Sequence, residues 1–284
     1  LKGLSEPPAD IDSWVNNDAK VISWNRNLKE LLVKKRSMLF DTAYIVPSVY
    51  RPFCKQFMYF EKDFNAMQYL QKKLFPTPHH KNLVICVSGL GGTKDFCTLI
   101  ADMVPDLNNL HSGTQCFPLY WYDENKGEPE VSLFGTSNEE RWTQRDGITD
   151  WCLQEVRSRF AGAQSITKED IFYYVYGLLH SPDYRERFAD DLRKALPRIP
   201  ILERVEEFIA FSKAGRRLAH LHLHYEDYAH EAEGVEVDER DYTAADEYAY
   251  YAVEKMRFPK KDERHTIIYN GHIAIHNIPA EAYD

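Results

Sequence analysis

The segment from residue 167 to residue 225 constrains the fold more than any other, because helix start signals recur along it. Thr167 is a typical N-cap residue, and Asp170 follows three positions later. Ser181 followed by Pro182 is a second start, since proline suits the first turn of a helix. These signals predict two helices in succession.

Apolar spacing and prolines set the extent of this helical block. The second pattern continues to Leu196, and Pro197 prevents it from going further. A third apolar stripe at helical spacing runs from Phe208 to Tyr225. The sequence therefore predicts three helices, with a change of character at about residue 166.

Near the end of the chain, the run TIIYNGHIAIHNI predicts a β-hairpin. Two alternating apolar runs flank Asn270-Gly271, the dipeptide suited to a type I′ turn. The preceding acidic stretch, residues 226–246, has few large aliphatic side chains and is expected to include a solvated loop.

The N-terminal half has mixed character. An amphipathic helix is expected within residues 18–36, and it ends in the basic cluster Lys34, Lys35 and Arg36. Runs rich in β-branched and aromatic residues predict strands at 43–50, 55–60, 82–89 and 116–122.

These patterns together predict an α+β fold. We expect a mixed-sheet N-terminal lobe at residues 1–165 and a helical C-terminal lobe at residues 166–284, closed by the β-hairpin.

The formal net charge of −9 argues at first against a nucleic-acid partner, but the charge is unevenly distributed. Residues 1–100 carry 14 Lys/Arg against 9 Asp/Glu, residues 101–220 carry 15 against 20, and residues 221–284 carry 6 against 15. A basic third suits a chain with one side facing a polyanion, whereas solvated charge is the usual explanation for a modest imbalance. Both interpretations stay open.

The stretch VICVSGLGGTKDF, residues 84–96, has the order of a strand, a phosphate loop and its lysine. A P-loop requires Ser or Thr after the lysine, but Asp95 follows Lys94, and its carboxylate would repel phosphate. The GxGxxG dinucleotide pattern is also absent. We therefore expect a strand and a turn without a nucleotide site, where backbone amides can still approach a DNA phosphate.

Other catalytic and metal patterns are weak. The five cysteines include no CxxC pair, which favours reduced thiols. Several histidines lie within residues 220–230, and of these only His220 and His224 are spaced to share a helix face. Because no HExxH pattern is present, we favour surface histidines over a metal site. No nucleophile elbow of GxSxG type is present.

The sequence has no apolar run near the ~18 residues of a membrane span and no signal-peptide pattern at its start. We therefore expect a cytoplasmic protein with no membrane partner. Because the chain starts at Leu1 and stops soon after a strand pattern, we also expect a fragment of a longer polypeptide.

Five segments in order carry a family resemblance: VYRPFCKQFMYF (49–60), NLVICVSGLGGTKDF (82–96), QCFPLYWY (115–122), DIFYYVYGLLHSPDYRERFADDLRKALPRIPI (170–201) and TIIYNGHIAIHNIP (266–279). Through them the chain resembles the C-terminal specificity, or target recognition, domain of type ISP restriction-modification enzymes, which are single-polypeptide type I enzymes.

The resemblance implies a parent enzyme that is an ATP-dependent endonuclease and an adenine-specific DNA methyltransferase. The Walker A and Asn/Asp-Pro-Pro-Tyr/Phe motifs of those activities are absent from this sequence. ATP, magnesium and S-adenosylmethionine are therefore implied for the parent enzyme, and no cofactor and no catalytic residue is expected in this segment. Its implied partners are double-stranded DNA and the methyltransferase domain of the same parent chain.

Nine residues are the candidate DNA-binding set. The cations expected at phosphates are Lys34, Lys35, Arg36, Arg51, Lys55 and Lys94. The candidates for reading base edges are Arg51, Gln56, Ser88 and Thr93.

The expected function is sequence-specific recognition of duplex DNA as a module of a restriction-modification enzyme. The alternative is a protein–protein docking module without direct DNA contact, in which the acidic C-terminal third binds a partner domain and the basic segment is solvated.

Overall fold

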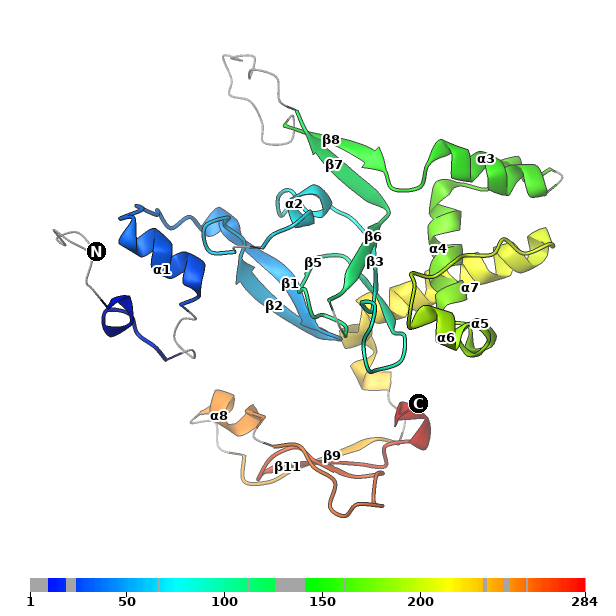
Figure 1. The fold of residues 1–284 in the computed structure, drawn as a ribbon. Helices are drawn as coiled ribbons and strands as arrows, with labels where there is room; N and C mark the ends of the chain where they lie inside the picture. The colour runs from blue at the N-terminus through cyan, green and yellow to red at the C-terminus, as the bar shows by residue number, and fades with distance from the viewer. Residues whose placement is uncertain are drawn as a thin grey trace. The chain divides into compact units, whose positions relative to one another are not determined.

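The computed structural model describes residues 10–18, 24–65, 67–111, 113–125, 141–160, 162–231, 234–242, 246–253 and 255–283. The chain divides into two compact units (Figure 1). The larger unit is Leu1–Leu223 and the smaller unit is His224–Asp284. The helices within residues 168–223 thus share a unit with most of the described strands, and the separation into lobes at residue 165 stays a prediction.

The helices are α1 (Arg26–Val33), α2 (Gln71–Leu74), α3 (Asp150–Arg159), α4 (Lys168–Leu179), α5 (Pro182–Arg187), α6 (Ala189–Leu192), α7 (Val205–Leu223) and α8 (Glu247–Tyr251). The strands are β1 (Ile45–Arg51), β2 (Cys54–Tyr59), β3 (Val84–Val87), β4 (Thr98–Ala101), β5 (Val104–Pro105), β6 (Gln115–Pro118), β7 (Tyr120–Glu124), β8 (Trp142–Asp146), β9 (Glu236–Glu239), β10 (Ile267–Ile268) and β11 (Ile273–His276). This mixture of small sheets and helices confirms the expected α+β class. No helix in the described ranges is both long enough and apolar enough to cross a bilayer.

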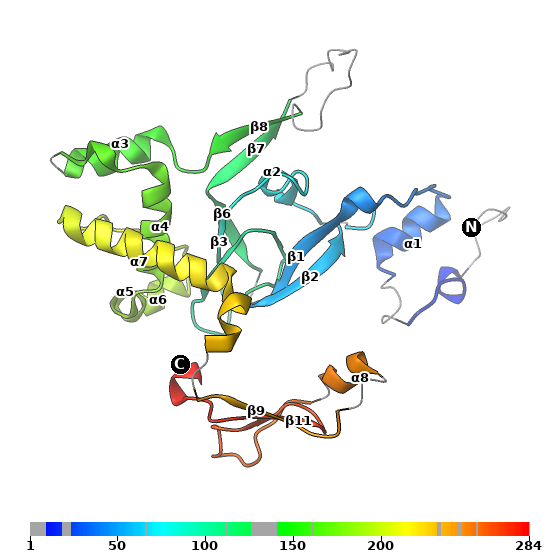
Figure 2. The ribbon, with the colours of Figure 1, turned by 180° about the vertical axis from the view of Figure 1, so that it is seen from behind.

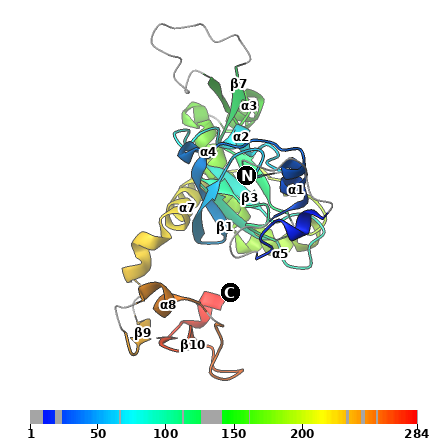
Figure 3. The same ribbon diagram turned by 90° about the vertical axis from the view of Figure 1, so that its left-hand side faces the viewer.

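Three small sheets build the β part of the larger unit. Their strand orders are β2-β1-β5, β4-β3-β6 and the pair β7-β8. The strand β3 is central in its sheet and buried at all four positions, which explains its continuous apolar run. Seen from the side, β1 and β3 lie between α1 and α7 (Figure 3).

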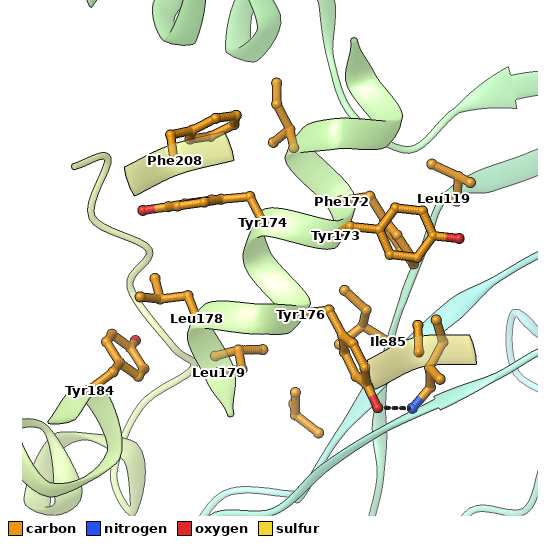
Figure 4. Packing of buried hydrophobic residues seen from close by; sticks show 14 of the residues in the cluster. Ile85, Leu119, Phe172, Tyr173, Tyr174, Tyr176, Leu178, Leu179, Tyr184 and Phe208 are labelled. Atoms are coloured by element: carbon orange, nitrogen blue, oxygen red, sulfur yellow. Dashed lines mark hydrogen bonds between the residues drawn. The ribbon is translucent and has the colours of Figure 1, made fainter. Parts of the chain in front are cut away.

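The main core lies where helices α4 and α7 pack against the β3 sheet. Ile85 of β3, Ile100 of β4 and Leu119, between β6 and β7, lie in one buried cluster with aromatic residues of α4 and Phe208 of α7. Figure 4 shows Ile85, Leu119 and Phe208 around α4. The Tyr176 hydroxyl, on a fully buried side chain, accepts a hydrogen bond from the Ile100 N–H at 3.1 Å. The buried hydroxyl thereby has a hydrogen-bond partner, and the bond joins α4 to β4.

Helices α4 and α7 cross each other in the two opposite views (Figures 1 and 2), and Gly177 and Gly215 lie where they meet. The capping box at the start of α4 is as predicted: Thr167 and Asp170 exchange side-chain and backbone hydrogen bonds of 3.1 and 3.0 Å. Arg216 of α7 then pairs with Glu169 at 2.8 Å and lies over the Tyr173 ring.

The second predicted helix is interrupted. It ends at Arg187, and Phe188 adopts φ −112° and ψ 19° before the short α6. Arg185 donates to the Phe96 carbonyl at 2.5 Å, and Arg193 pairs with Asp95 at 2.7 Å. Both halves are therefore tied to the segment that precedes β4, a tertiary contact that periodicity does not reveal.

Other predicted bounds also shift. The strand expected at residues 116–122 is two strands, because β6 joins the β3 sheet whereas β7 pairs with β8. The helix expected within residues 18–36 starts at Arg26, where Asn25 is its N-cap, and residues 19–23 lie outside the described part. Helix α3, which lies near the end of the predicted N-terminal lobe, was not predicted.

The smaller unit contains a sheet of order β10-β11-β9. The antiparallel pair β10–β11, with Ile267 opposite Ile275, confirms the predicted hairpin. The prediction of a type I′ turn was wrong, because neither Asn270 nor Gly271 has the positive φ that this turn requires. Strand β9 lies inside the acidic stretch that was expected to include a solvated loop, and no strand was predicted there.

Candidate nucleic-acid interface

The basic cluster of residues 34–36 lies just after α1. Lys34 is the C-cap of α1, and Lys35 adopts φ +53° directly after it. Arg36 pairs with Asp63 at 3.1 Å, and Asn27 of α1 donates to the Asp63 carbonyl. The turn that follows β2 therefore anchors the cluster, and all three side chains are exposed.

The β1–β2 hairpin carries Arg51, Lys55 and Gln56. Arg51 Nη1 pairs with Asp106 at 2.8 Å, and its guanidinium lies 4.0 Å from the centre of the Tyr50 ring. Lys55 and Gln56 are both exposed on β2, but successive side chains of a strand point to opposite faces. One DNA-facing surface of this sheet can therefore use only one of them.

The glycine-rich turn joins β3 to β4. These strands are antiparallel, so no helix N-terminus follows the glycines as a phosphate loop requires. The Ser88 side chain is buried, and its hydroxyl accepts from the Cys97 N–H at 3.1 Å. Thr93 and Lys94 are exposed to solvent, whereas the Ser88 hydroxyl is used in a hydrogen bond at the end of the β3–β4 pair.

The β1–β2 turn and the glycine-rich turn are connected through a third segment. Arg51 reaches Asp106, while the carbonyl of His111 accepts from the Gly89 N–H at 2.8 Å. The segment 106–111 thus lies between the β1–β2 turn and the glycine-rich turn. The cluster after α1 is anchored near the other end of the hairpin, about 20 Å away for a six-residue strand. The nine candidates therefore do not form one cluster.

Sequence reasoning missed a groove of about 860 Å³ beside the β1–β2 hairpin. We define the aromatic groove by four exposed rings that line it, those of Tyr50, Phe57, Tyr69 and Trp121. Phe57 is 78% exposed although it lies within a strand. An aromatic residue directly after the polar pair Lys55 and Gln56 was the available signal, but its neighbours in space come from elements distant in sequence.

Amide side chains also line the aromatic groove. Gln56 and Gln115 are exposed, while Gln71 contributes a deeper amide. Gln71 Nε2 donates to the Pro105 carbonyl at 3.3 Å, and its Oε1 atom is buried without a hydrogen-bond partner among the described residues. Gln56 is the one member of the candidate DNA-binding set that lines the groove.

A pair of neighbouring cysteines lies at the groove. Cys116, which lines it, is directly opposite the buried Cys86 on the neighbouring strand. A hydrogen bond from the Cys86 thiol lowers the pKa of Cys116, and the same contact with burial raises the pKa of Cys86 well above its ordinary value.

The described histidines do not gather into a metal site. No group of three or more His, Cys, Asp or Glu side chains is placed to hold an ion in the ranges that the structure describes. His222 instead contacts the Tyr176 hydroxyl through Nδ1 at 2.6 Å.

Comparison with known families gives one match over almost the whole chain. Residues 4–284 match the family model described as the Type ISP C-terminal specificity domain. A search of curated proteins found no match.

Several solved structures share the fold, and three of them are described below. "ATP-dependent Type ISP restriction-modification enzyme LlaBIII bound to DNA" is 33% identical with a TM-score of 0.73, and the match covers 92% of this chain and 16% of that one. A nuclease-deletion mutant of the Type ISP enzyme LlaGI, in complex with a DNA substrate mimic, is 33% identical with a TM-score of 0.68 and coverages of 96% and 22%. The cryoEM structure of a DrdV–DNA complex is 31% identical with a TM-score of 0.74 and coverages of 96% and 25%. The chain thus spans a quarter or less of the length of these proteins.

Proposed function

The chain belongs to the family of Type ISP C-terminal specificity domains, and from this premise we propose that it recognises a short sequence in duplex DNA for a restriction-modification enzyme. The observation that carries the proposal is the shared fold, over 92–96% of this chain, with three proteins whose structures contain DNA or a DNA mimic. Identities of 31–33% over that length support a common mode of action.

The geometry supports two kinds of DNA contact. Exposed cations after α1 and at the glycine-rich turn suit phosphates, where they contribute affinity that depends on salt and not on sequence. Exposed amide and hydroxyl groups, such as those of Gln56 and Thr93, suit base edges. Lys34, Lys35, Arg36 and Lys94 contact phosphates in this proposal, and Arg51 and Gln56 contact base edges. Lys55 points to the other face of β2 and is not part of this contact.

The larger protein is also part of the proposal. Methyltransferase and nuclease domains of the parent chain would act on the site that this module selects, with ATP, magnesium and S-adenosylmethionine as their cofactors. The methyltransferase domain is the expected intramolecular partner, and the expected place of action is the cytoplasm. None of these cofactors has a motif in this sequence.

Selection from a pool of randomised duplexes at two salt concentrations tests the proposal. Enrichment of one short motif, with weaker retention at high salt, is the expected result. A folded chain that enriches no motif and retains no duplex would contradict it and would favour the docking alternative.

A charge variant tests where phosphates lie. Replacing Lys34, Lys35 and Arg36 by alanine should reduce the slope of log affinity against log salt by about two to three. Lys260 and Lys261, exposed in the smaller unit, are the matched control pair, and their replacement should leave the slope unchanged. Equal slopes for wild type and the triple variant would remove the cluster after α1 from the phosphate-contacting surface.

A further inference from the structure

We propose that the aromatic groove binds DNA bases that have left the base stack, so that the chain holds an unstacked base in addition to recognising the duplex. This inference rests on the proposed DNA-binding function and adds to it the binding of a base outside the base stack. It is carried by the rings, cations and amides that meet in the groove.

The rings are the first observation. Tyr50, Phe57, Tyr69 and Trp121 come from β1, β2, the segment before α2, and β7, and each is at least 41% exposed. Leaving four large rings in water around one concavity costs stability, because their burial would contribute folding free energy. A flat π-face is the surface on which a base stacks, and any of the four bases can use it.

The cations at the rim are the second observation. The Arg51 guanidinium lies 4.0 Å from the centre of the Tyr50 ring, and Lys73 Nζ lies 5.1 Å from that of Trp121. Both cations also pair with carboxylates, Arg51 with Asp106 and Lys73 with Asp123. The Tyr50 and Trp121 rings thus each have a cation beside them, and a carboxylate holds that cation in place. This arrangement suits a nucleotide that presents a base and a phosphate together.

The amides are the third observation. Gln56 and Gln115 are exposed at the groove, and Gln71 Oε1 lies buried without a hydrogen-bond partner among the described residues. Because an unsatisfied buried acceptor is costly, a small rearrangement that let Gln71 accept from a base amino or imino group would be favoured. Amides donate and accept at once, as the edges of all bases require.

The concave shape distinguishes this occupant from a stacked duplex. In B-DNA the base edges lie about 8.5 Å deep in the major groove, so reading them requires an element that protrudes. A concavity of about 860 Å³, in the range of ligand sites, instead accepts a group that protrudes from its own chain. A base displaced from a duplex is such a group.

The test uses the whole chain and three probes: a perfect duplex, the same duplex with one unpaired extrahelical thymine, and oligothymidylate. Phe57→Ala and Trp121→Leu remove rings of the groove. Tyr248→Ala is the matched control, because Tyr248 is 89% exposed and lies in the smaller unit.

The expected result is tighter binding of the bulged duplex than of the perfect duplex by wild type. Phe57→Ala and Trp121→Leu should weaken binding of the bulged duplex and of oligothymidylate by roughly 5- to 150-fold. Both variants should bind the perfect duplex as wild type does, and Tyr248→Ala should leave all three affinities unchanged. Thermal melting of each variant verifies that it is folded.

Three results would overturn the inference in different ways. Equal affinity of wild type for perfect and bulged duplexes would show that no base enters the groove, although DNA binding itself would stand. Unchanged binding of the unstacked probes by both ring variants would place the site elsewhere. Failure of wild type to bind any of the probes would contradict the proposed function as well, and would favour a protein segment as the occupant of the groove.

Discussion

Two glycines determine how closely α4 and α7 cross. A Cβ atom on Gly215 would lie 2.0 Å from the Tyr173 carbonyl oxygen, and one on Gly177 would lie 2.5 Å from that of Phe211. No side chain larger than hydrogen fits at these distances, so the helix backbones must separate if either position is changed. The sequence shows glycines inside helical patterns, but only the packed structure shows that they face each other.

Gly215→Ala should therefore destabilise the larger unit. We expect the free energy of unfolding to fall by about 1–3 kcal/mol, the usual cost of overpacking a core. Urea unfolding followed by circular dichroism measures it. Gly271→Ala is the control, because its Cβ would meet no atom within 4 Å and its φ is outside the left-handed region. A variant at Gly215 as stable as wild type would show that the helices can separate without loss.

His180 is a buried titratable group near the same core. Burial, with further contributions from His222 and Arg185, lowers its pKa from 6.5 to about 4. Its Nε2 atom is buried without a hydrogen-bond partner among the described residues, and its ring lies 4.7 Å from the Tyr176 ring. Burial also lowers the pKa of His222. The folded state therefore resists protonation of both imidazoles.

Stability should consequently fall in weak acid. Between pH 6.5 and about 4 the unfolded chain binds a proton at His180 that the folded chain does not bind, so unfolding becomes easier as the pH decreases. The full loss of stability from His180 is on the order of 3 kcal/mol. Above pH 6.5 there is no loss, because the imidazole is neutral in both the folded and the unfolded chain. His180→Leu should flatten the decrease in urea midpoint over this interval. An equally steep decrease in that variant would assign the pH dependence to other groups.

At the scale of elements, local signals determined helix starts better than helix ends. The caps at Thr167 and Ser181 are where the sequence predicts them, since an N-cap bond involves residues three apart. The end of α5 depends on Arg185, Arg193 and the segment before β4, which lie far apart in sequence. Long-range contacts of this kind override periodicity.

Thr167→Ala should cost about 1 kcal/mol of stability, because it leaves the Asp170 N–H without its hydrogen-bond acceptor at the start of α4. Thermal unfolding measures the change. Ser158→Ala is the matched control, since the exposed Ser158 hydroxyl only donates to the Glu155 carbonyl within α3. A loss no greater than that of the control would mean that tertiary packing alone holds the first turn of α4.

At the scale of the whole molecule, the smaller unit has its own hydrogen-bonded centre. Asn270 is buried; its amide donates to the carbonyls of Tyr250 and Ala252, and its Oδ1 accepts from the N–H groups of His272 and Ile273. Four bonds from one side chain join α8 and its C-cap to the hairpin turn. This role, and not a positive φ, explains the asparagine of the NG dipeptide.

Asn270→Ala should loosen the smaller unit selectively. Removing the side chain leaves two carbonyls and two N–H groups without their partners, each at a cost of about 1–3 kcal/mol if it stays buried. Hydrogen exchange followed by mass spectrometry should show lost protection in residues 246–283 and unchanged protection in α4 and α7. Equal loss in both units would contradict their description as separate compact units.

The candidate site shows the same division. Arg51 and Gln56 were selected from sequence as polar groups able to read base edges, and they lie at the rim and wall of the aromatic groove. Tyr69 and Trp121 were not selected, because nothing local connects the segment before α2 with β7. Their common groove exists only after three small sheets and α2 have packed together.

What the sequence by itself determined are the features that depend on neighbours within about four residues: the caps of α4 and α5, the β1–β2 hairpin and the pair β10–β11. The five segments named in the sequence analysis, in their order along the chain, also indicated the family through their resemblance to type ISP specificity domains. Only the tertiary structure decided the glycine crossing of α4 and α7, the break at Phe188 and the aromatic groove. Each of these depends on contacts between residues distant in the chain, whose geometry is set when whole elements pack and not by local conformational preference.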